Sequence, residues 1–309
     1  MSQEGNLPLT HPSSLIPHPL IEMRAYIPAY ELTVPGTLGD ALALLRDEPG
    51  VWRPFAGGTD LMVLLEAGKL DHRKFFSVAR LTELRGVEES DRHVTLGALT
   101  TYSDVRRSVV LSREFPMLAH AASETGGLAI QNRGTVGGNI ANASPAADTP
   151  PALLAYGAEV ELVSTEGPRW VEYADFHTGY KQTVMRGDEL IARVRLPRPV
   201  KGARHFYRKV GTRRAQAISK VCFAALAETN GDGGFAEVRI ALGSVAPVVL
   251  RCRRAEELLK GRRPDAELVG DALTALAEDI RPIDDIRSTA RYRTRVAQNL
   301  LAEFLAGGV

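Results

Sequence analysis

The spacing of apolar residues along the chain predicts a mixture of helices and strands. After Thr37, apolar residues at positions 41, 42, 44 and 45 recur with helical spacing, and Pro49-Gly50 ends the segment. At 93–98, apolar and polar residues alternate as in a strand with one buried face. The same reasoning predicts strands at 25–32, 52–56, 75–78, 158–163, 169–173, 189–196, 206–210, 219–228 and 236–242. It predicts helices at 60–67, 101–108, 116–124, 150–155, 254–259, 266–277 and 290–305.

The order of these elements predicts an α+β fold with two domains. Strands and helices alternate in 21–82, which is typical of a small lobe with parallel strands, and a second lobe covers 83–200. Pro197, Pro199 and Gly202 indicate a linker, after which residues 201–309 form a smaller α+β domain. Residues 1–20 lack Lys and Arg and contain four prolines, unlike a targeting signal. We expect a flexible leader there, with a docking arm for a partner subunit as the alternative.

Two glycine-rich stretches interrupt the pattern of buried elements. One is a long polar stretch at 134–152, which contains Gly137-Gly138 and for which we expect a loop. The other, at 55–60, lies between a predicted strand and a predicted helix. Glycines allow close backbone approach, and successive exposed N–H groups suit a phosphate, so the pair could hold the two phosphates of a dinucleotide. Neither stretch matches G-x-G-x-x-G or a P-loop. Asp148 is a suitable N-cap for the helix at 150–155.

Charge and cysteine content exclude several classes of function. The formal net charge is +1 without a sustained basic block, so nucleic acid is not an expected partner. The sequence has no long apolar run that would span a membrane. Two distant cysteines, Cys222 and Cys252, cannot supply an iron–sulfur cluster, a zinc site or a disulfide framework, and they favour a reducing cytoplasm. The histidines at 93, 120, 177 and 205 have no nucleophile at a recognisable spacing, so we expect structural roles for them.

The two glycine stretches carry a resemblance to a known family. They resemble the two FAD signatures of the flavin-binding medium subunits of molybdenum hydroxylases, a family that includes xanthine dehydrogenase and carbon monoxide dehydrogenase. The matching motifs are Ala56-Gly57-Gly58-Thr59-Asp60 and Thr135-Val136-Gly137-Gly138-Asn139, the latter followed by Ala143-Ser144-Pro145-Ala146-Ala147-Asp148. The resemblance extends from about Tyr26 to Phe304.

This resemblance implies a fold, a cofactor and a set of binding residues. The fold would be a two-lobed FAD-binding domain of the vanillyl-alcohol-oxidase/PCMH type, followed by a C-terminal domain of the molybdenum hydroxylase flavoprotein type that closes over the flavin edge. The implied cofactor is FAD, and we expect neither a catalytic residue nor a metal ligand in this chain. The implied cofactor-binding residues are Pro54, Phe55, Ala56, Gly57, Gly58, Thr59, Asp60, Leu61, Thr125, Gly126, Thr135, Val136, Gly137, Gly138, Asn139, Asp148, Ile191 and Lys209.

Some of these residues have two interpretations. A carboxylate is repelled by a diphosphate, so Asp148 would accept hydrogen bonds from ribityl or ribose hydroxyls, or would only cap a helix. Ile191 matches a residue that borders the isoalloxazine. Lys209 matches a flavin-contacting lysine, and a cation beside the ring would stabilise the anionic reduced flavin; outside this motif it would be an ordinary surface lysine. The roles of Lys181 and Arg133 stay open.

The resemblance also implies a function and partners. The chain would be the FAD-binding electron-transfer subunit of a molybdenum hydroxylase. Electrons would come from a large molybdenum–pterin subunit through a small subunit with two [2Fe–2S] clusters, and would leave through FAD to NAD⁺, oxygen or a quinone.

Two other functions fit the same sequence. One is a self-contained vanillyl-alcohol-oxidase-like flavin oxidoreductase with its own substrate pocket. Such enzymes often attach FAD to a His or Cys, and neither residue type adjoins the glycine motifs. The other is a nucleotide-binding scaffold without redox turnover, which a reductant that bleaches the flavin would exclude.

Overall fold

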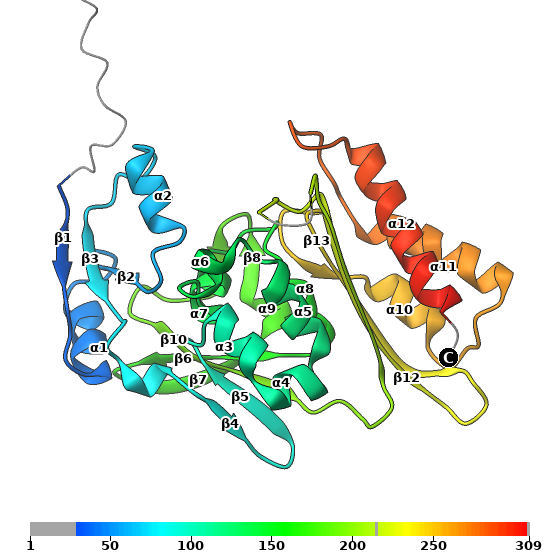
Figure 1. The fold of residues 1–309 in the computed structure, drawn as a ribbon, viewed down its shortest axis with the longest axis horizontal. Coiled ribbons are helices and arrows are strands. Elements are labelled where there is room, and N and C mark those ends of the chain that lie inside the picture. Colours follow the sequence, from blue (N-terminus) through cyan, green and yellow to red (C-terminus); the bar gives the residue numbers. More distant parts are fainter. Residues whose placement is uncertain (1–28, 214–215, 308–309) are drawn as a thin grey trace, which may run out of the picture.

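The computed structural model describes residues 29–213 and 216–307, which form three parts in a row (Figure 1). A small lobe, blue in Figure 1, packs beside a larger green lobe, and a yellow-to-red domain covers the other side of the larger lobe. The predicted leader at 1–20, and positions 25–28 of the first predicted strand, lie outside the described residues. Within the described ranges, none of the helices combines the length and apolar character needed to cross a bilayer.

The first lobe is a parallel sheet with strand order β1-β3-β2. Its α1 begins as predicted, because Thr37 and Asp40 form a reciprocal capping box. One face of α1 is buried through Ala41, Leu42 and Leu45. The elements are β1 (Glu31–Thr33), α1 (Leu38–Asp47), β2 (Arg53–Phe55), α2 (Leu61–Glu66) and β3 (Lys74–Ser77). The predicted parallel arrangement is therefore present.

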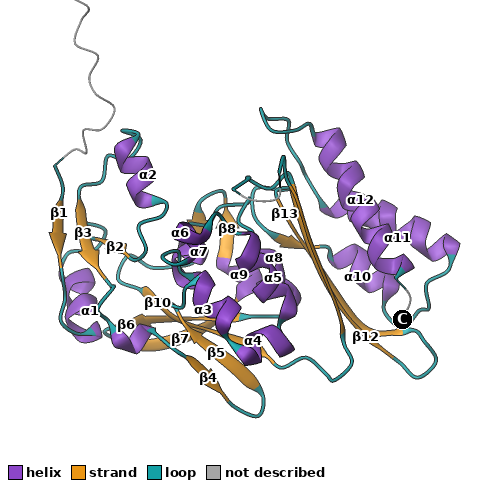
Figure 2. Cartoon of the chain, viewed as in Figure 1, coloured by secondary structure: helices purple, strands orange, loops and turns teal. Residues whose placement is uncertain are grey.

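The second lobe is an antiparallel sheet with helices gathered on one face (Figure 2). Strand order is β4-β5-β10-β6-β7. The strands are β4 (Val87–Glu89), β5 (His93–Gly97), β6 (Glu159–Ser164), β7 (Gly167–Glu172) and β10 (Leu190–Pro197), with a separate hairpin of β8 (His177–Gly179) and β9 (Gln182–Thr183). The helices are η1 (Thr82–Leu84), α3 (Tyr102–Arg107), α4 (Val109–Glu114), α5 (Pro116–Glu124), α6 (Leu128–Gln131), α7 (Val136–Ala141), α8 (Pro150–Ala155) and α9 (Tyr173–Phe176).

Strand β10 belongs to two hydrophobic cores because its side chains alternate between the faces of the sheet, with a bulge between Ile191 and Arg193 that keeps Ile191 and Val194 in the same core. Ile191, Val194 and Leu196 pack in the core beneath the helices of the second lobe. Leu190 and Ala192 pack in the core shared with α1 of the first lobe. This alternation holds the two lobes together along one strand.

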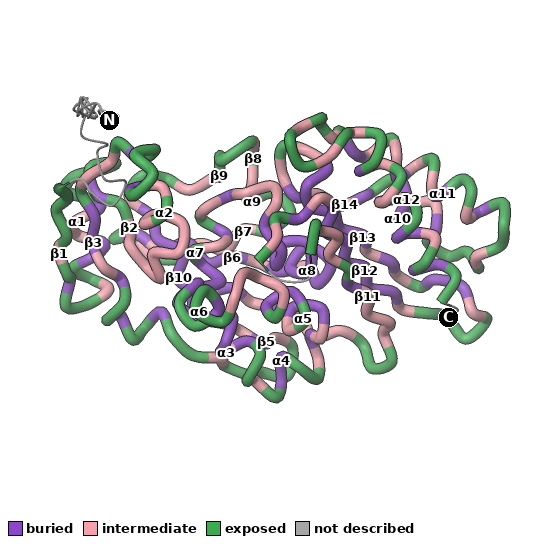
Figure 3. Tube along the Cα trace, turned by 45° about the horizontal axis from the view of Figure 1, so that its top comes forward, coloured by how far each residue is buried: buried purple, intermediate pink, exposed green. Residues whose placement is uncertain are grey.

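The C-terminal domain places a sheet between two layers. Strand order is β11-β12-β13-β14, with β11 (Arg204–Val210), β12 (Val221–Thr229), β13 (Phe235–Gly243) and β14 (Leu250–Arg251). One face packs against the second lobe, where α8 contacts β12 and β13, and the buried trace is continuous in Figure 3. The other face is covered by α10 (Arg253–Leu259), α11 (Ala266–Asp279) and α12 (Ala290–Ala306). Alternate residues of β12 enter the two cores, so nearly the whole strand is buried.

The structure differs from the prediction in the polar stretch at 134–152. We expected a loop, and the stretch instead contains the short helix α7. Val136 and Ile140 are four residues apart, as on one face of a helix, and both are buried. Two glycines between them have low helix propensity and mask this pattern.

Candidate functional site

A cavity of about 710 Å³ lies where the first and second lobes meet, within the size range of small-molecule sites. Its walls come from the β2–α2 segment, the α7 segment, β10 and the loop before β10. It brings together these members of the predicted set: Pro54, Ala56, Gly57, Gly58, Thr59, Asp60, Leu61, Thr135, Gly137, Gly138, Asn139 and Ile191. The two glycine stretches, about 80 positions apart in sequence, therefore face one cavity.

The first glycine stretch approaches the second lobe closely. A Cβ on Gly57 would lie 1.9 Å from the carbonyl oxygen of Arg133, so only glycine fits there. Arg133 Nε in turn donates to the Gly57 carbonyl at 3.2 Å. Gly58 has φ of +73°, in the left-handed region that favours glycine. Backbone without side chains thus lines this part of the cavity.

The second glycine stretch is the body of α7. Gly137 packs tightly against Ala98, the residue after β5, because a Cβ on Gly137 would lie 2.6 Å from Ala98 Cβ. Thr135 caps the helix by accepting a hydrogen bond from Gly138 N at 3.1 Å. Gly138 is exposed toward the cavity, whereas Val136 is buried in the core. A side chain at position 138 would therefore enter the cavity.

The cavity residues fit FAD. Both glycine stretches line the cavity with residues that carry no side chain, so their backbone N–H groups could contact phosphates there. Apolar side chains line the rest of the wall and suit a flat aromatic ring: Trp52, Val78, Leu84, Leu99, Leu190 and Ile191.

Six predicted site residues do not line this cavity. Phe55 points away and packs edge-on against Phe75, and Val136 is in the core. The other four, Thr125, Gly126, Asp148 and Lys209, lie near one another beside it.

Asp148 and Lys209 form a buried ion pair between the second lobe and the C-terminal domain. Lys209 Nζ donates to Asp148 Oδ2 at 2.7 Å and to the carbonyl of Glu124, next to Thr125, at 2.8 Å. Ser219 Oγ donates to Asp148 Oδ1 at 2.5 Å. We call Asp148, Lys209 and Ser219 the Asp148 cluster. Burial raises the pKa of the Asp148 carboxyl and Lys209 opposes that shift.

The Asp148 cluster adjoins the cavity through the next residue, Thr149, whose Oγ1 donates to Oδ1 of the cavity residue Asn139 at 2.6 Å. The Tyr102 side chain lines the cavity, and its pKa is raised by burial and by the charge of Asp148. The predicted N-cap role of Asp148 is wrong. Thr149 is the N-cap of α8, and the Asp148 side chain binds Lys209 and Ser219.

Sequence reasoning missed several residues of the cavity wall. Asn142 follows α7. Lys181, whose role the sequence leaves open, lies in the β8–β9 hairpin. His72 precedes β3, and its Nε2 lies 2.7 Å from the carbonyl of Lys74. No local motif marks these positions, because the tertiary fold alone brings them to the glycine stretches. Further residues of the wall that the sequence did not indicate include Tyr102, Met185 and Arg186, and the apolar Trp52, Val78, Leu84, Leu99 and Leu190.

The described residues supply no metal centre. Within residues 29–213 and 216–307, no group of three or more His, Cys, Asp or Glu side chains could hold an ion. Cys222 and Cys252 are both free and buried.

Arg186, a charged residue of the cavity wall, forms ion pairs with Asp188 and Glu189.

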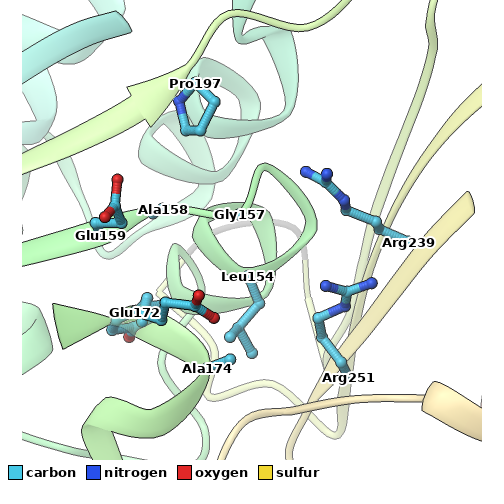
Figure 4. Close-up of a pocket in the computed structure, with 10 residues that line it drawn as sticks. Leu154, Gly157, Ala158, Glu159, Glu172, Ala174, Pro197, Arg239 and Arg251 are labelled. Carbon is cyan, nitrogen blue, oxygen red and sulfur yellow. The ribbon is translucent and has the colours of Figure 1, made fainter. Parts of the chain in front are cut away.

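A second cavity, of about 380 Å³, lies between the second lobe and the C-terminal domain (Figure 4). Arg239 and Arg251 enter it from one side and Glu159 and Glu172 from the other. Arg251 is paired with Glu256 at 2.6 Å, and Glu159 is paired with Arg195 at the same distance. Neither glycine stretch reaches this cavity, so it does not fit the expected cofactor.

Comparison with known proteins identifies the family of this chain. The FAD-binding domain of molybdopterin dehydrogenases matches residues 28–199, and the C-terminal domain of carbon monoxide dehydrogenase flavoproteins matches residues 205–307. The chain is 31% identical to the xanthine dehydrogenase FAD-binding subunit of Escherichia coli O157:H7, over 88% of this chain and 94% of that protein. It is 28% identical to the carbon monoxide dehydrogenase medium chain of Hydrogenophaga pseudoflava, over 90% and 96%.

Solved structures show the same likeness in three dimensions. A chain of carbon monoxide dehydrogenase from Hydrogenophaga pseudoflava superimposes with a TM-score of 0.86 at 29% identity, covering 90% of this chain and 96% of that one. Quinoline 2-oxidoreductase from Pseudomonas putida 86 gives a TM-score of 0.84 at 25% identity, over 92% and 98%. The chain belongs to the molybdenum hydroxylase family as its FAD-binding medium subunit, an oxidoreductase component.

Proposed function

We propose that this chain passes electrons from the [2Fe–2S] clusters of a small partner subunit, through its FAD, to an external acceptor such as NAD⁺, oxygen or a quinone. A large molybdenum–pterin subunit would be the source of the electrons. The observation that supports this function is the cavity between the two glycine stretches, in a chain whose relatives are named as subunits and medium chains of dehydrogenases.

In this function the protein binds and orients, and FAD, when bound, supplies reversible two-electron and one-electron transfer. The glycine stretches would hold the diphosphate, since their backbone approaches without side chains. Leu190 and Ile191 would pack against the ring. Electron transfer requires no general acid or base from the chain, and Glu189 of the cavity wall is paired with Arg169 and Arg186.

We also propose that the polar edge of the ring approaches the Asp148 cluster. Asp148 precedes Thr149, whose hydroxyl donates to Asn139 of the cavity wall. Lys209 carries a positive charge there, and Thr125 and Gly126 follow the carbonyl that it binds. A cation at this edge would stabilise reduced flavin.

The domain division at about residue 200 and a cytoplasmic location belong to the same proposal. β10 ends at Pro197 and β11 begins at Arg204, so the linker predicted between them separates two sheets. The two free, buried thiols fit a reducing compartment.

The test is electron transfer in the assembled complex. The small subunit is purified separately, its clusters are reduced with dithionite and the excess reductant is removed. It is then mixed anaerobically with the large subunit and with this chain, which carries oxidised FAD. The proposal predicts that the flavin absorbance of this chain bleaches after mixing and recovers when NAD⁺, oxygen or a quinone is added. A flavin that stays oxidised beside reduced clusters would contradict the proposed function.

The self-contained flavin oxidoreductase is the second candidate, and His72 in the cavity wall favours it, because such enzymes often bind FAD through histidine. Acid precipitation of the protein separates the two functions. We expect all flavin in the supernatant as free FAD. Flavin that remains in the pellet and is lost in His72→Ala would support the second candidate.

A further inference from the structure

Lys181 lies at the mouth of the cavity in an unusual backbone conformation. It stands in the turn of the β8–β9 hairpin, between Gly179 and Gln182, and has φ of +58°. A non-glycine residue in the left-handed region is uncommon and marks positions that the surrounding structure fixes. The residue is exposed at the hairpin tip, and its side chain contributes to the cavity wall. The hairpin thus presents a lysine to the cavity.

The Lys181 side chain begins a chain of contacts that crosses from the second lobe to the first. Its Nζ donates to Asn142 Oδ1 at 2.5 Å, and Asn142 Nδ2 donates to Asp60 Oδ1 at 3.2 Å. Asn142 is the C-cap residue of α7, and Asp60 is the N-cap residue of α2. Each therefore adjoins one of the two glycine stretches. All three side chains line the cavity. We call Lys181, Asn142 and Asp60 the Lys181 latch.

A diphosphate in the cavity would need a positive charge beside it, and Lys181 could supply that charge. A dinucleotide diphosphate carries two negative charges, and Asp60 adds a third at the same place. The glycine stretches offer backbone dipoles, and Arg186 is engaged by Asp188 and Glu189. Lys181 is a cation whose contacts reach both stretches. Partial loss of hydration lowers the pKa of its ammonium, and the charge of Asp60 opposes this shift.

We propose that the Lys181 latch binds the diphosphate of FAD: Lys181 neutralises the phosphates and Asp60, and Asn142 holds the ammonium between the two glycine stretches. This inference rests on the cavity as the FAD site. It assigns the hairpin at 177–183 a direct role in cofactor binding, which the glycine motifs do not include. The latch also ties the first lobe to the second at the point where the ligand would bridge them.

The experiment measures the dissociation constants of FAD, ADP and riboflavin for apoprotein prepared from the wild-type chain and its variants. In Lys181→Met we expect FAD and ADP to bind about 10- to 100-fold more weakly, the range of a lost charge-assisted hydrogen bond. Riboflavin lacks phosphate, so its affinity should not change. Lys181→Arg keeps the charge and should recover most of the affinity for FAD and ADP. Lys69→Met, at an exposed lysine outside the cavity wall, is the matched control and should bind as wild type.

The three probes separate the outcomes. Equal losses for FAD, ADP and riboflavin in Lys181→Met would mean a general distortion of the cavity and would overturn the latch. Unchanged FAD affinity in both Lys181→Met and Asn142→Ala would overturn it as well. A wild-type apoprotein that binds neither FAD nor ADP would contradict the cavity itself. Thermal unfolding of the ligand-free variants, which we expect to match wild type within about 1–2 °C, reports whether the fold is intact.

Discussion

The cavity between the first and second lobes and the Asp148 cluster use opposite chemistry. The cavity places glycines where any side chain would collide with backbone or fill the site, as at Gly57 and Gly138. The Asp148 cluster instead buries charged side chains, with 3% of the Lys209 side chain and 10% of the Asp148 side chain exposed. Both sets of residues come from one family resemblance, and the structure separates them into two adjacent places.

This difference shows how the two regions should respond to mutation. A larger side chain in the cavity occupies space that the ligand needs, so the affinity for FAD should fall more than the stability of the fold. Substitution in the cluster leaves a buried charge without a partner, so the free energy of unfolding should fall more than the affinity for FAD. The following predictions test this distinction.

Gly138→Val should abolish the yellow colour of the protein. The valine side chain enters the cavity, and its Cβ also lies only 2.8 Å from Thr135 Oγ1. We expect FAD affinity to fall by at least about 100-fold, which is about 2.7 kcal/mol. The measurement is FAD content by absorbance, with circular dichroism to show that the fold persists. Gly231→Val is the matched control, because no atom lies within 4 Å of the added Cβ. A Gly138→Val protein with full FAD content would remove α7 from the site.

Lys209→Met should lower the free energy of unfolding by about 3–5 kcal/mol, because Asp148 remains buried without its cation. Denaturant titration measures this loss. The double variant Asp148→Asn/Lys209→Met should recover part of this loss of stability, since both charges are then absent.

In Lys209→Met, FAD should stay bound with a more negative reduction potential. Lys201→Met, at an exposed lysine, should change neither the free energy of unfolding nor the reduction potential. If the potential of Lys209→Met equals that of wild type, the cluster does not reach the flavin ring.

Ser219→Ala should lower the free energy of unfolding by about 1.5–3 kcal/mol, since Asp148 Oδ1 loses a buried hydrogen-bond donor. The affinity for FAD should change less than twofold. Urea titration and an FAD-binding curve on the same preparation give both numbers. A large loss of FAD affinity with normal stability would assign Ser219 to the cavity.

Thr135→Ala should have the smallest effect, a loss of about 1 kcal/mol of stability, because it removes the N-cap of α7. Thr135→Ser keeps the capping hydroxyl and serves as the control. Urea titration of the two variants should separate them by that amount. Equal stability of both variants would show that α7 is held by packing of Val136 and Ile140 instead.

Much of the fold was predictable because its signals are local. The capping box at Thr37 and Asp40 and the alternation at 93–98 predict α1 and β5 from their own residues. The linker near Pro197 and the antiparallel C-terminal sheet likewise follow from local signals. Helix α7 was missed, since its glycines suppress the helical signal and its stability comes from contact with Ala98 and the core. Tertiary context decides such short helices.

The site was predictable where it depends on backbone and not where it depends on distant side chains. Gly57 and Gly138 stand in motifs, so the sequence points to them directly. Lys181 and Asn142 meet only because the β8–β9 hairpin folds over α7. Asp148 looks like a helix cap in sequence, and only the approach of β11 and the 219–221 segment reveals its partners. Contacts between residues that lie far apart in the sequence leave no pattern around either residue.

The flavin content of the wild-type chain, measured from its absorption spectrum before and after denaturation, tests directly whether the cavity binds FAD. We expect an oxidised-flavin spectrum and the release of FAD in a ratio approaching one per chain. It also predicts that colourless apoprotein takes up added FAD and that Gly138→Val does not. A wild-type chain that is purified without flavin and takes up none would contradict the assignment of the cavity as the FAD site.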